Sequence, residues 1–271
     1  MKQKWWILLT LLLCGCGASS QPDQTGAVQN DRPRLSASME ETAENVAAVE
    51  KNENLEKNPS NSNQNPGEGQ NWTVFAMDTV MQFDAYGGSA NLQEKVKRRV
   101  EELEGELSTT QENSDIFHLN QEKTAELSAD TRYLMQEALA LGAETDGALD
   151  ISIYPVVQSW GFTTGNYRVP SESERESLLK SVDYRLVGLE ADTASIEPGM
   201  MVDLGGVGKG FTGDEVVKTM KEDGVTSALF SLGGNIQTIG TKPDGEKWYV
   251  GIKDPESDGY LGGVRVQDEA V

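Results

Sequence analysis

A long polar stretch, from residue 17 to residue 71, limits the part of this chain that can fold. It is dominated by Ser, Gln, Asn, Glu, Pro and Gly and contains no aromatic residue. Such a segment cannot bury enough apolar surface to offset the conformational entropy of the chain, so we expect a disordered tether. Residues 72–271 are left as the folded part, which is long enough for a substantial core in one or two domains.

The first sixteen residues have the pattern of an export signal. Lys2 and Lys4 precede an apolar run over residues 5–13 that is too short to span a bilayer as a permanent helix. The run ends at a sequence that resembles the bacterial lipobox, in which cleavage leaves a Cys that becomes diacylated. We therefore expect residues 1–16 to be a lipoprotein signal and Cys16 to anchor an extracytoplasmic protein to the cell membrane through its acyl chains. The alternative is an ordinary secretory signal with two incidental cysteines.

Charge and residue counts exclude several kinds of site. The chain has 23 Lys and Arg against 44 Asp and Glu, a formal net charge of −21, so a basic patch for nucleic acid is not expected. Cys14 and Cys16 are the only thiols in the sequence and His118 is its only imidazole. Neither a disulfide framework nor a Cys- or His-based metal centre fits the folded part. A metal here would be a hard cation held by oxygens, such as magnesium or calcium.

Hydrophobic periodicity over residues 72–271 mixes strands and helices. Residues 72–86 are predicted to form one half-buried strand. A helix is predicted over residues 92–107, with Asn91 and Glu94 as a capping box at its start. Further helices are predicted at 128–144, from 171 and at 214–223, a hairpin at 184–196, and strands at 200–204, 227–232, 236–239, 248–252 and 262–266. Strands and helices without strict alternation favour an α+β fold with a mixed or antiparallel sheet and packed helices.

The glycine-rich segment over residues 203–214 carries the clearest chemical signal. It reads Asp-Leu-Gly-Gly-Val-Gly-Lys-Gly-Phe-Thr-Gly-Asp and is predicted to link the strand at 200–204 to the helix at 214–223. Glycines let the backbone approach a ligand, a helix start offers N–H groups to an anion, and Lys209 adds positive charge, so we expect a phosphate-bearing ligand. The spacing excludes a P-loop. Gly208, Gly210 and Gly213 match the spacing of the dinucleotide fingerprint, but that match alone is a weak signal. A tight turn without a ligand is the alternative.

A second segment, over residues 145–150, places two carboxylates four residues apart. Asp146 and Asp150 flank a Gly and an Ala-Leu pair. They are compatible with a turn that caps the next element, and equally with acceptors for the nitrogens of a flat heteroaromatic ligand. From the residues alone both interpretations stay open.

Taken together, these motifs resemble those of a known family. The series comprises Met-Asp-Thr at 77–79, Ser-Thr at 108–109, Asn-Ser-Asp-Ile at 113–116 to Asn120, Asp-Gly-Ala-Leu-Asp at 146–150, Trp-Gly-Phe at 160–162, the glycine segment, Leu-Gly-Gly-Asn-Ile at 232–236 and the segment at 248–255. Their order and spacing resemble the FAD:protein FMN transferase family, known as ApbE. The resemblance implies an ApbE-like, T-fold-like domain over residues 72–271. It also implies magnesium-dependent transfer of FMN from FAD to a Thr of an extracytoplasmic acceptor flavoprotein, with release of AMP.

The same resemblance implies roles for individual residues. Those expected to bind the cofactor are Met77, Ala148, Leu149, Asp150, Asp203 and Lys209, with Lys209 near the pyrophosphate. The backbone carbonyl of Gly206 is expected to be a magnesium ligand. Thr110 stands where the family often has a Tyr that stacks on the nucleotide, and Asn235 stands where Asp is common.

The family pattern continues beyond the position of Val271. It includes a Thr-Ser-Gly strand, a His-x-x-Asp-Pro segment, and an Asp and a Thr that bind magnesium, none of which occurs before Val271. His118 is no substitute, because it lies far from that motif. The resemblance therefore predicts a truncated, catalytically incomplete sequence. Magnesium-dependent hydrolysis of FAD and a non-catalytic flavin-binding lipoprotein are the alternative functions.

Overall fold

The computed structural model describes residues 69–271. The predicted signal over residues 1–16 with Cys16, and residues 17–68 of the predicted tether, lie outside the described residues. The first strand begins at Gly69, three residues before the expected start of the folded part. The mixture of helices with antiparallel sheets confirms the predicted α+β class. Within the described range, no helix combines the length and apolar character that crossing a membrane requires.

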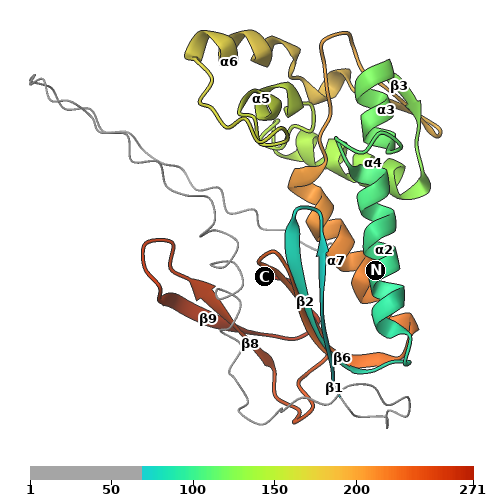
Figure 1. Ribbon diagram of the computed structural model, residues 1–271, viewed down its shortest axis with the longest axis vertical. Helices are drawn as coiled ribbons and strands as arrows, with labels where there is room; N and C mark the ends of the chain where they lie inside the picture. The colour runs from blue at the N-terminus through green and yellow to red at the C-terminus, as the bar shows by residue number, and fades with distance from the viewer. Residues whose placement is uncertain (1–68) are drawn as a thin grey trace, which may run out of the picture. The chain divides into compact units, whose positions relative to one another are not determined.

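A four-stranded antiparallel sheet forms one half of the described structure. Its strands follow the order β1 (Gly69–Ala76), β2 (Thr79–Gly87), β6 (Val225–Leu232) and β7 (Asn235–Ile239). Helices α2 (Leu92–Leu107) and α7 (Gly205–Glu222) run side by side and contribute to the core on one face of this sheet (Figure 1). Alternate strand residues and the inner residues of both helices form this core, which includes Met81, Phe83, Val96, Val100, Val216, Met220 and Phe230.

The predicted strand over residues 72–86 is in fact a β-hairpin. Met77 and Asp78 form its turn with φ of 50° and 56°, and Ala76 pairs with Thr79. Because the chain reverses at this turn, Phe75 is 68% exposed, whereas Met81 on β2 is fully buried. The sequence pattern does not predict this hairpin, because its turn lacks the Gly or Asn that usually adopts positive φ.

Helix α2 matches its prediction closely. All five apolar residues expected on its inner face are buried, namely Leu92, Val96, Val100, Leu103 and Leu107. The predicted capping box is wrong, since the Asn91 side chain makes no cap hydrogen bond. Val96 and Val100 pack in the core beside the sheet, and Leu103 and Leu107 in a second core. One continuous helix therefore serves both cores.

The second core lies in the other half of the described structure, which holds the remaining helices and a small sheet. Its helices are α3 (Asp115–Glu122), α4 (Ala129–Glu144), α5 (Tyr154–Ser159) and α6 (Glu172–Leu178), with 3₁₀ turns η1 (Leu179–Ser181) and η2 (Tyr184–Leu186). A three-stranded sheet has the order β3 (Thr124–Glu126), β5 (Thr193–Ser195) and β4 (Gly188–Glu190), and its β4–β5 pair is the predicted hairpin. Ser128 and Ser171 accept hydrogen bonds from the N–H groups of Thr131 and Glu174 and so cap α4 and α6, close to their predicted starts.

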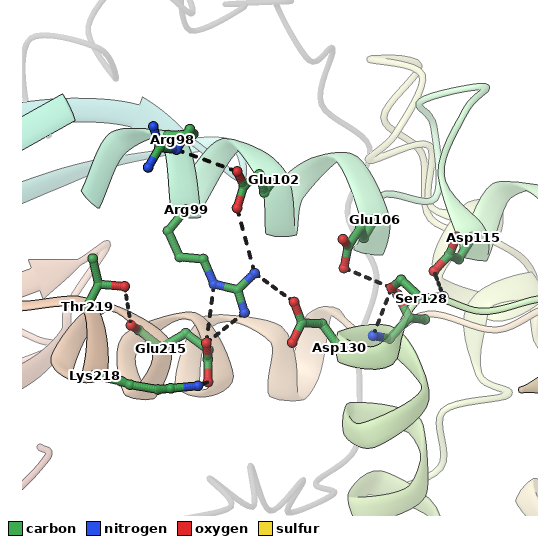
Figure 2. A network of polar contacts seen from close by, with 11 residues as sticks. Arg98, Arg99, Glu102, Glu106, Asp115, Ser128, Asp130, Glu215, Lys218 and Thr219 are labelled. Atoms are coloured by element: carbon green, nitrogen blue, oxygen red, sulfur yellow. Dashed lines mark hydrogen bonds and ion pairs between the residues drawn. The ribbon is translucent and has the colours of Figure 1, made fainter. Parts of the chain in front are cut away.

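An arginine joins three helices between the two cores (Figure 2). Arg99 on α2 donates to Asp130 on α4 at 2.6 Å, and through Nη2 and Nε to Glu215 on α7 at 2.6 and 3.2 Å. The hydrogen bond to Asp130 is the main cause that raises the pKa of the Arg99 guanidinium. Its side chain is 19% exposed, so this contact is shielded from solvent more than a surface ion pair.

The last two strands pack on the other face of the large sheet. β8 (Trp248–Lys253) and β9 (Tyr260–Val266) form an antiparallel pair, close to the predicted strands. Trp248, Val250 and Val266 pack against Leu229 of β6. Farther along, Val271 exchanges two backbone hydrogen bonds of 2.8 Å with Ile236 of β7.

Candidate functional site

The glycine-rich segment forms the first turns of a helix instead of a loop. Helix α7 begins at Gly205, not at residue 214, so the predicted helix boundary is wrong. Helical glycines cost about 1 kcal/mol each relative to Ala, which conceals the helix in the sequence. Packing explains one of them. A Cβ at Gly213 would lie 2.1 Å from Nε2 of Gln237.

The start of α7 presents donors to the outside. Oδ1 of Asp203 accepts the N–H of Gly205 at 2.8 Å. Within residues 69–271 nothing accepts the N–H of Gly206, and a Cβ at this exposed residue would meet no atom closer than Cδ1 of Leu149 at 3.8 Å. An open N–H at the start of an eighteen-residue helix is a site suited to an anion.

Lys209 adds a positive charge in the next turn of the same helix. Its side chain is half-buried, and no carboxylate within the described range pairs with it. In a chain with a net charge of −21, an unpaired lysine beside an open helix start favours binding of a phosphate group. The role expected for Lys209 beside a pyrophosphate stays a prediction.

Residues 148–150 lie beside the start of α7, but their side chains differ in role. Leu149 faces Gly206 and packs against the second core, and Ala148 is exposed. Asp150 is turned inward. Its Oδ1 accepts the N–H and hydroxyl of Ser152 at 2.8 and 2.6 Å, and its Oδ2 accepts the N–H of Tyr184 at 3.0 Å. Of the two interpretations left open for this carboxylate, the structure displays the turn-stabilising one.

The backbone around Asp150 is tied directly to the glycine segment. The carbonyl of Ile151 accepts the N–H of Asp203 at 2.8 Å, and Ile153 forms an isolated parallel bridge with Met201. The strand predicted over residues 200–204 is therefore wrong as a sheet strand, because this bridge is its single ladder contact in the described part of the chain.

Met77 contacts α7 through its side chain. Its Sδ accepts a hydrogen bond from Oγ1 of Thr212 at 3.5 Å, and its N–H donates to Oε1 of Glu104 at 2.7 Å. Thr212 lies three residues beyond Lys209 on α7. Leu149, Asp203, Gly206 and Lys209 thus lie at the first turns of α7, and Met77 contacts the same helix at Thr212. Sequence reasoning missed Glu104, which stands in no recognisable motif, and gave no role to Thr212 within the glycine-rich segment.

Thr110 forms its hydrogen bonds with Ser108 and not with the other predicted site residues. It is exposed, its N–H donates to Oγ of Ser108 at 3.1 Å, and its hydroxyl lies 3.2 Å from the same atom. The loop that carries it follows Leu107, which packs near Gly208 of α7. The loop is near the helix start, while the Thr110 side chain itself makes no bond to the other predicted site residues in the described range.

A magnesium ion would find few protein ligands among the described residues. No group of three or more His, Cys, Asp or Glu within residues 69–271 is placed to hold a metal. The Gly206 carbonyl and the Asp203 carboxylate are oxygen donors of the type that magnesium uses, but two donors do not complete an octahedral site. The described residues fit a phosphate-bearing nucleotide better than a cation bound by protein alone.

Comparisons with known proteins agree with this picture. The model of the ApbE family matches residues 77–271. An FAD:protein FMN transferase of Vibrio cholerae is 30% identical over 176 residues, covering 63% of this chain and 53% of the relative. The one from Escherichia coli K12 is 27% identical over 201 residues, covering 69% and 56%. The chain thus spans about half the length of these relatives.

Solved structures show the same fold. The crystal structure of the ApbE protein from Thermotoga maritima matches with a TM-score of 0.70 and 26% identity, over 75% of this chain and 69% of that one. The flavin transferase ApbE from Vibrio cholerae matches with a TM-score of 0.68 and 26% identity, over 76% and 71%. These matches confirm the expected ApbE-like fold.

Proposed function

The chain belongs to the ApbE family, and on that premise we propose that it transfers FMN from FAD to a Thr hydroxyl of an acceptor protein and releases AMP. One observation carries the proposal. The open N–H of Gly206 and the unpaired Lys209 lie three residues apart in the first turns of α7, where Leu149 and Asp203 also lie. A diphosphate is the ligand group whose charge and size suit that combination.

The proposed reaction is a phosphoryl transfer. The acceptor hydroxyl attacks the phosphorus on the FMN side of FAD, a new O–P bond forms, and the bond between that phosphorus and the oxygen of AMP breaks. The hydroxyl proton passes to a base, and AMP leaves with the bridging oxygen. The residues of this chain contribute by orienting the diphosphate and by offsetting its charge, which is the main requirement of such a transfer.

Three parts of the site have distinct tasks in this proposal. The N–H of Gly206 and the dipole of α7 hold one phosphate, and Lys209 offsets the charge that develops on the departing AMP. Leu149 provides an apolar contact beside Gly206, and Met77 contacts the same helix farther along, at Thr212. The Gly206 carbonyl would be one protein ligand of magnesium, which when bound would supply additional positive charge.

The central test compares two lysines of the same helix. Lys209→Gln should weaken FAD binding about tenfold or more, the size of one charge-assisted contact. Lys218→Gln is the matched control, because Lys218 is 63% exposed on α7 and lies 3.8 Å from Glu215. Flavin fluorescence quenching gives both affinities. Equal affinities for the two variants would refute the assignment of Lys209.

Products and metal dependence test the reaction itself. FMN that stays on an acceptor protein in a denaturing gel indicates transfer, and free FMN indicates hydrolysis of FAD. FAD bound without either product indicates a flavin-binding protein. Addition of EDTA should sharply weaken FAD binding, because the acidic chain would otherwise repel the diphosphate. Unchanged affinity would contradict the role of magnesium.

We also propose that the protein works outside the cytoplasm as a lipoprotein anchored at Cys16. The support is the sequence of the first sixteen residues alone. Metabolic labelling with an alkyne fatty acid should tag the wild type and leave Cys16→Ala untagged, whereas Cys14→Ala should keep the label. Equal labelling of all three proteins would refute the anchor.

A further inference from the structure

The segment that leads into α7 is held by a side chain instead of a strand. Asn120, in the last turn of α3, is 3% exposed. Its Nδ2 donates to the carbonyl of Val202 at 2.8 Å, and its Oδ1 accepts the N–H of Val202 at 2.6 Å. Two residues paired across antiparallel strands exchange the same two bonds. The amide of Asn120 therefore takes the place of a missing strand partner.

A lysine at the end of α3 reinforces this contact. Nζ of Lys123 donates to the carbonyl of Asn120 at 2.6 Å and to the carbonyl of Met200 at 3.0 Å. Lys123 itself ends the helix with φ of 67°. Its ammonium therefore links the final turn of α3 to the chain two residues before Val202.

The opposite side of the segment is held by backbone contacts. Ile153 bridges Met201, and the carbonyl of Ile151 accepts the N–H of Asp203. Successive residues from 200 to 203 are thus bonded alternately to α3 and to the chain at 151–153. Val202 is fully buried, so its N–H and carbonyl have no water to replace a lost partner.

We propose that Asn120 is a positioning residue for the nucleotide site. By fixing both polar groups of Val202, it sets the place of Asp203 and of the open N–H of Gly206, which follow within four residues. This inference rests on the proposed function, since it assigns the aligned groups to FAD. Misplacement of binding groups by about 1 Å is enough to lose much of their effect.

The test uses the full chain and two variants of one residue. Asn120→Leu removes both hydrogen bonds, and Asn120→Asp keeps an acceptor for the N–H of Val202 but turns an oxygen toward its carbonyl. Val96→Ala is the control, because Val96 is equally buried on α2 but packs against the large sheet. Hydrogen exchange of the peptide covering residues 200–206 and FAD affinity are measured for each protein, well below its melting temperature.

Both Asn120 variants should accelerate exchange in this peptide and weaken FAD binding about tenfold, the loss expected for one misplaced phosphate contact. Val96→Ala should lower the melting temperature while keeping exchange and affinity within about twofold of wild type. Equal effects of the control, or wild-type affinity in the Asn120 variants, would overturn the proposal. If the wild type does not bind FAD, the proposed function fails, and the exchange data still decide whether Asn120 holds the segment.

Discussion

The N–H of Met77 donates a hydrogen bond to Oε1 of Glu104 at 2.7 Å, which joins the turn between β1 and β2 to helix α2. Both turn residues have positive φ although neither is glycine. Such backbone strain costs about 1–3 kcal/mol per residue and persists only where surrounding contacts enforce it. Glu104 is one of those contacts, and Thr212 at the Met77 sulfur is another.

Glu104→Ala should lower the free energy of unfolding by about 1–2 kcal/mol, because the N–H of Met77 loses its acceptor. Glu104→Gln keeps an oxygen at the same place and should cost less than half as much. Urea denaturation of both variants measures the difference. Identical losses would show that the carboxylate charge, and not the acceptor, matters.

Two helical glycines should respond in opposite directions to alanine. Gly105→Ala on α2 meets no atom within 4 Å, so it should gain about 0.5–1 kcal/mol from helix propensity. Gly213→Ala should instead lose about 1–3 kcal/mol, since its Cβ would lie 2.1 Å from Nε2 of Gln237. Thermal melts monitored by circular dichroism compare them. A gain at Gly213 would mean that the Gln237 side chain moves aside freely.

Removal of Arg99 should leave two carboxylates without their shared partner. Arg99→Met is expected to cost about 2–4 kcal/mol, as for other shielded ion pairs that lose one member. The double variant Arg99→Met with Glu215→Gln should recover part of this loss, because one orphaned charge is gone. A double-mutant cycle in urea tests the coupling between the two residues. Strictly additive losses would contradict it.

Asp84 should make the fold less stable at neutral pH than at mildly acidic pH. Burial raises the pKa of its carboxyl, against the opposing hydrogen bond from Asn71. Because the pKa of Asp84 is higher in the folded than in the unfolded protein, the folded protein binds more protons between these two pKa values. The loss of stability caused by the Asp84 charge is therefore complete above the folded-state pKa. It disappears as pH falls to the ordinary carboxyl range. Asp84→Asn should therefore stabilise the protein at pH 7 and lose that advantage in acid.

Asp268 supplies the control of opposite sign. The N–H of Gly240, and to a smaller extent Lys221, lowers the pKa of its carboxyl. Its contribution to stability is present above the ordinary carboxyl range and is lost as pH falls through the lowered value. Asp268→Asn should thus destabilise at pH 7 and converge with wild type in acid. Parallel pH profiles for Asp84→Asn, Asp268→Asn and wild type would contradict both assignments.

Sequence reasoning was accurate where a local pattern determines the structure. The inner face of α2 follows a period of 3.6 residues, and Ser128 and Ser171 cap helices through contacts three residues away. It failed where distant contacts override local preference. Gly213 of α7 stands where the distant Gln237 side chain leaves no room for a Cβ, and the hairpin turn at Met77 is held by Glu104.

In the candidate site too, local motifs were recognised in the sequence and contacts between distant residues were not. The glycine-rich segment indicated Lys209, and the resemblance to the ApbE family added Asp203; the structure places Lys209 in the first turns of α7 and Asp203 just before it. The pairing of Asn120 with Val202 joins residues 82 positions apart, so no local pattern reveals it. The motif that contains Asn120 was recognised in the sequence. The role of Asn120 follows only from the folded structure, in which this residue lies beside Val202.

Helix α2 serves both cores, and so does its neighbour α7, through Phe211 in one core and Val216 and Met220 in the other. Because α2 and α7 each contribute buried side chains to both cores, unfolding of either half would also remove packing contacts from the other half. Heating should therefore melt the whole described body in a single cooperative step, with no stable half-folded form for proteases to find.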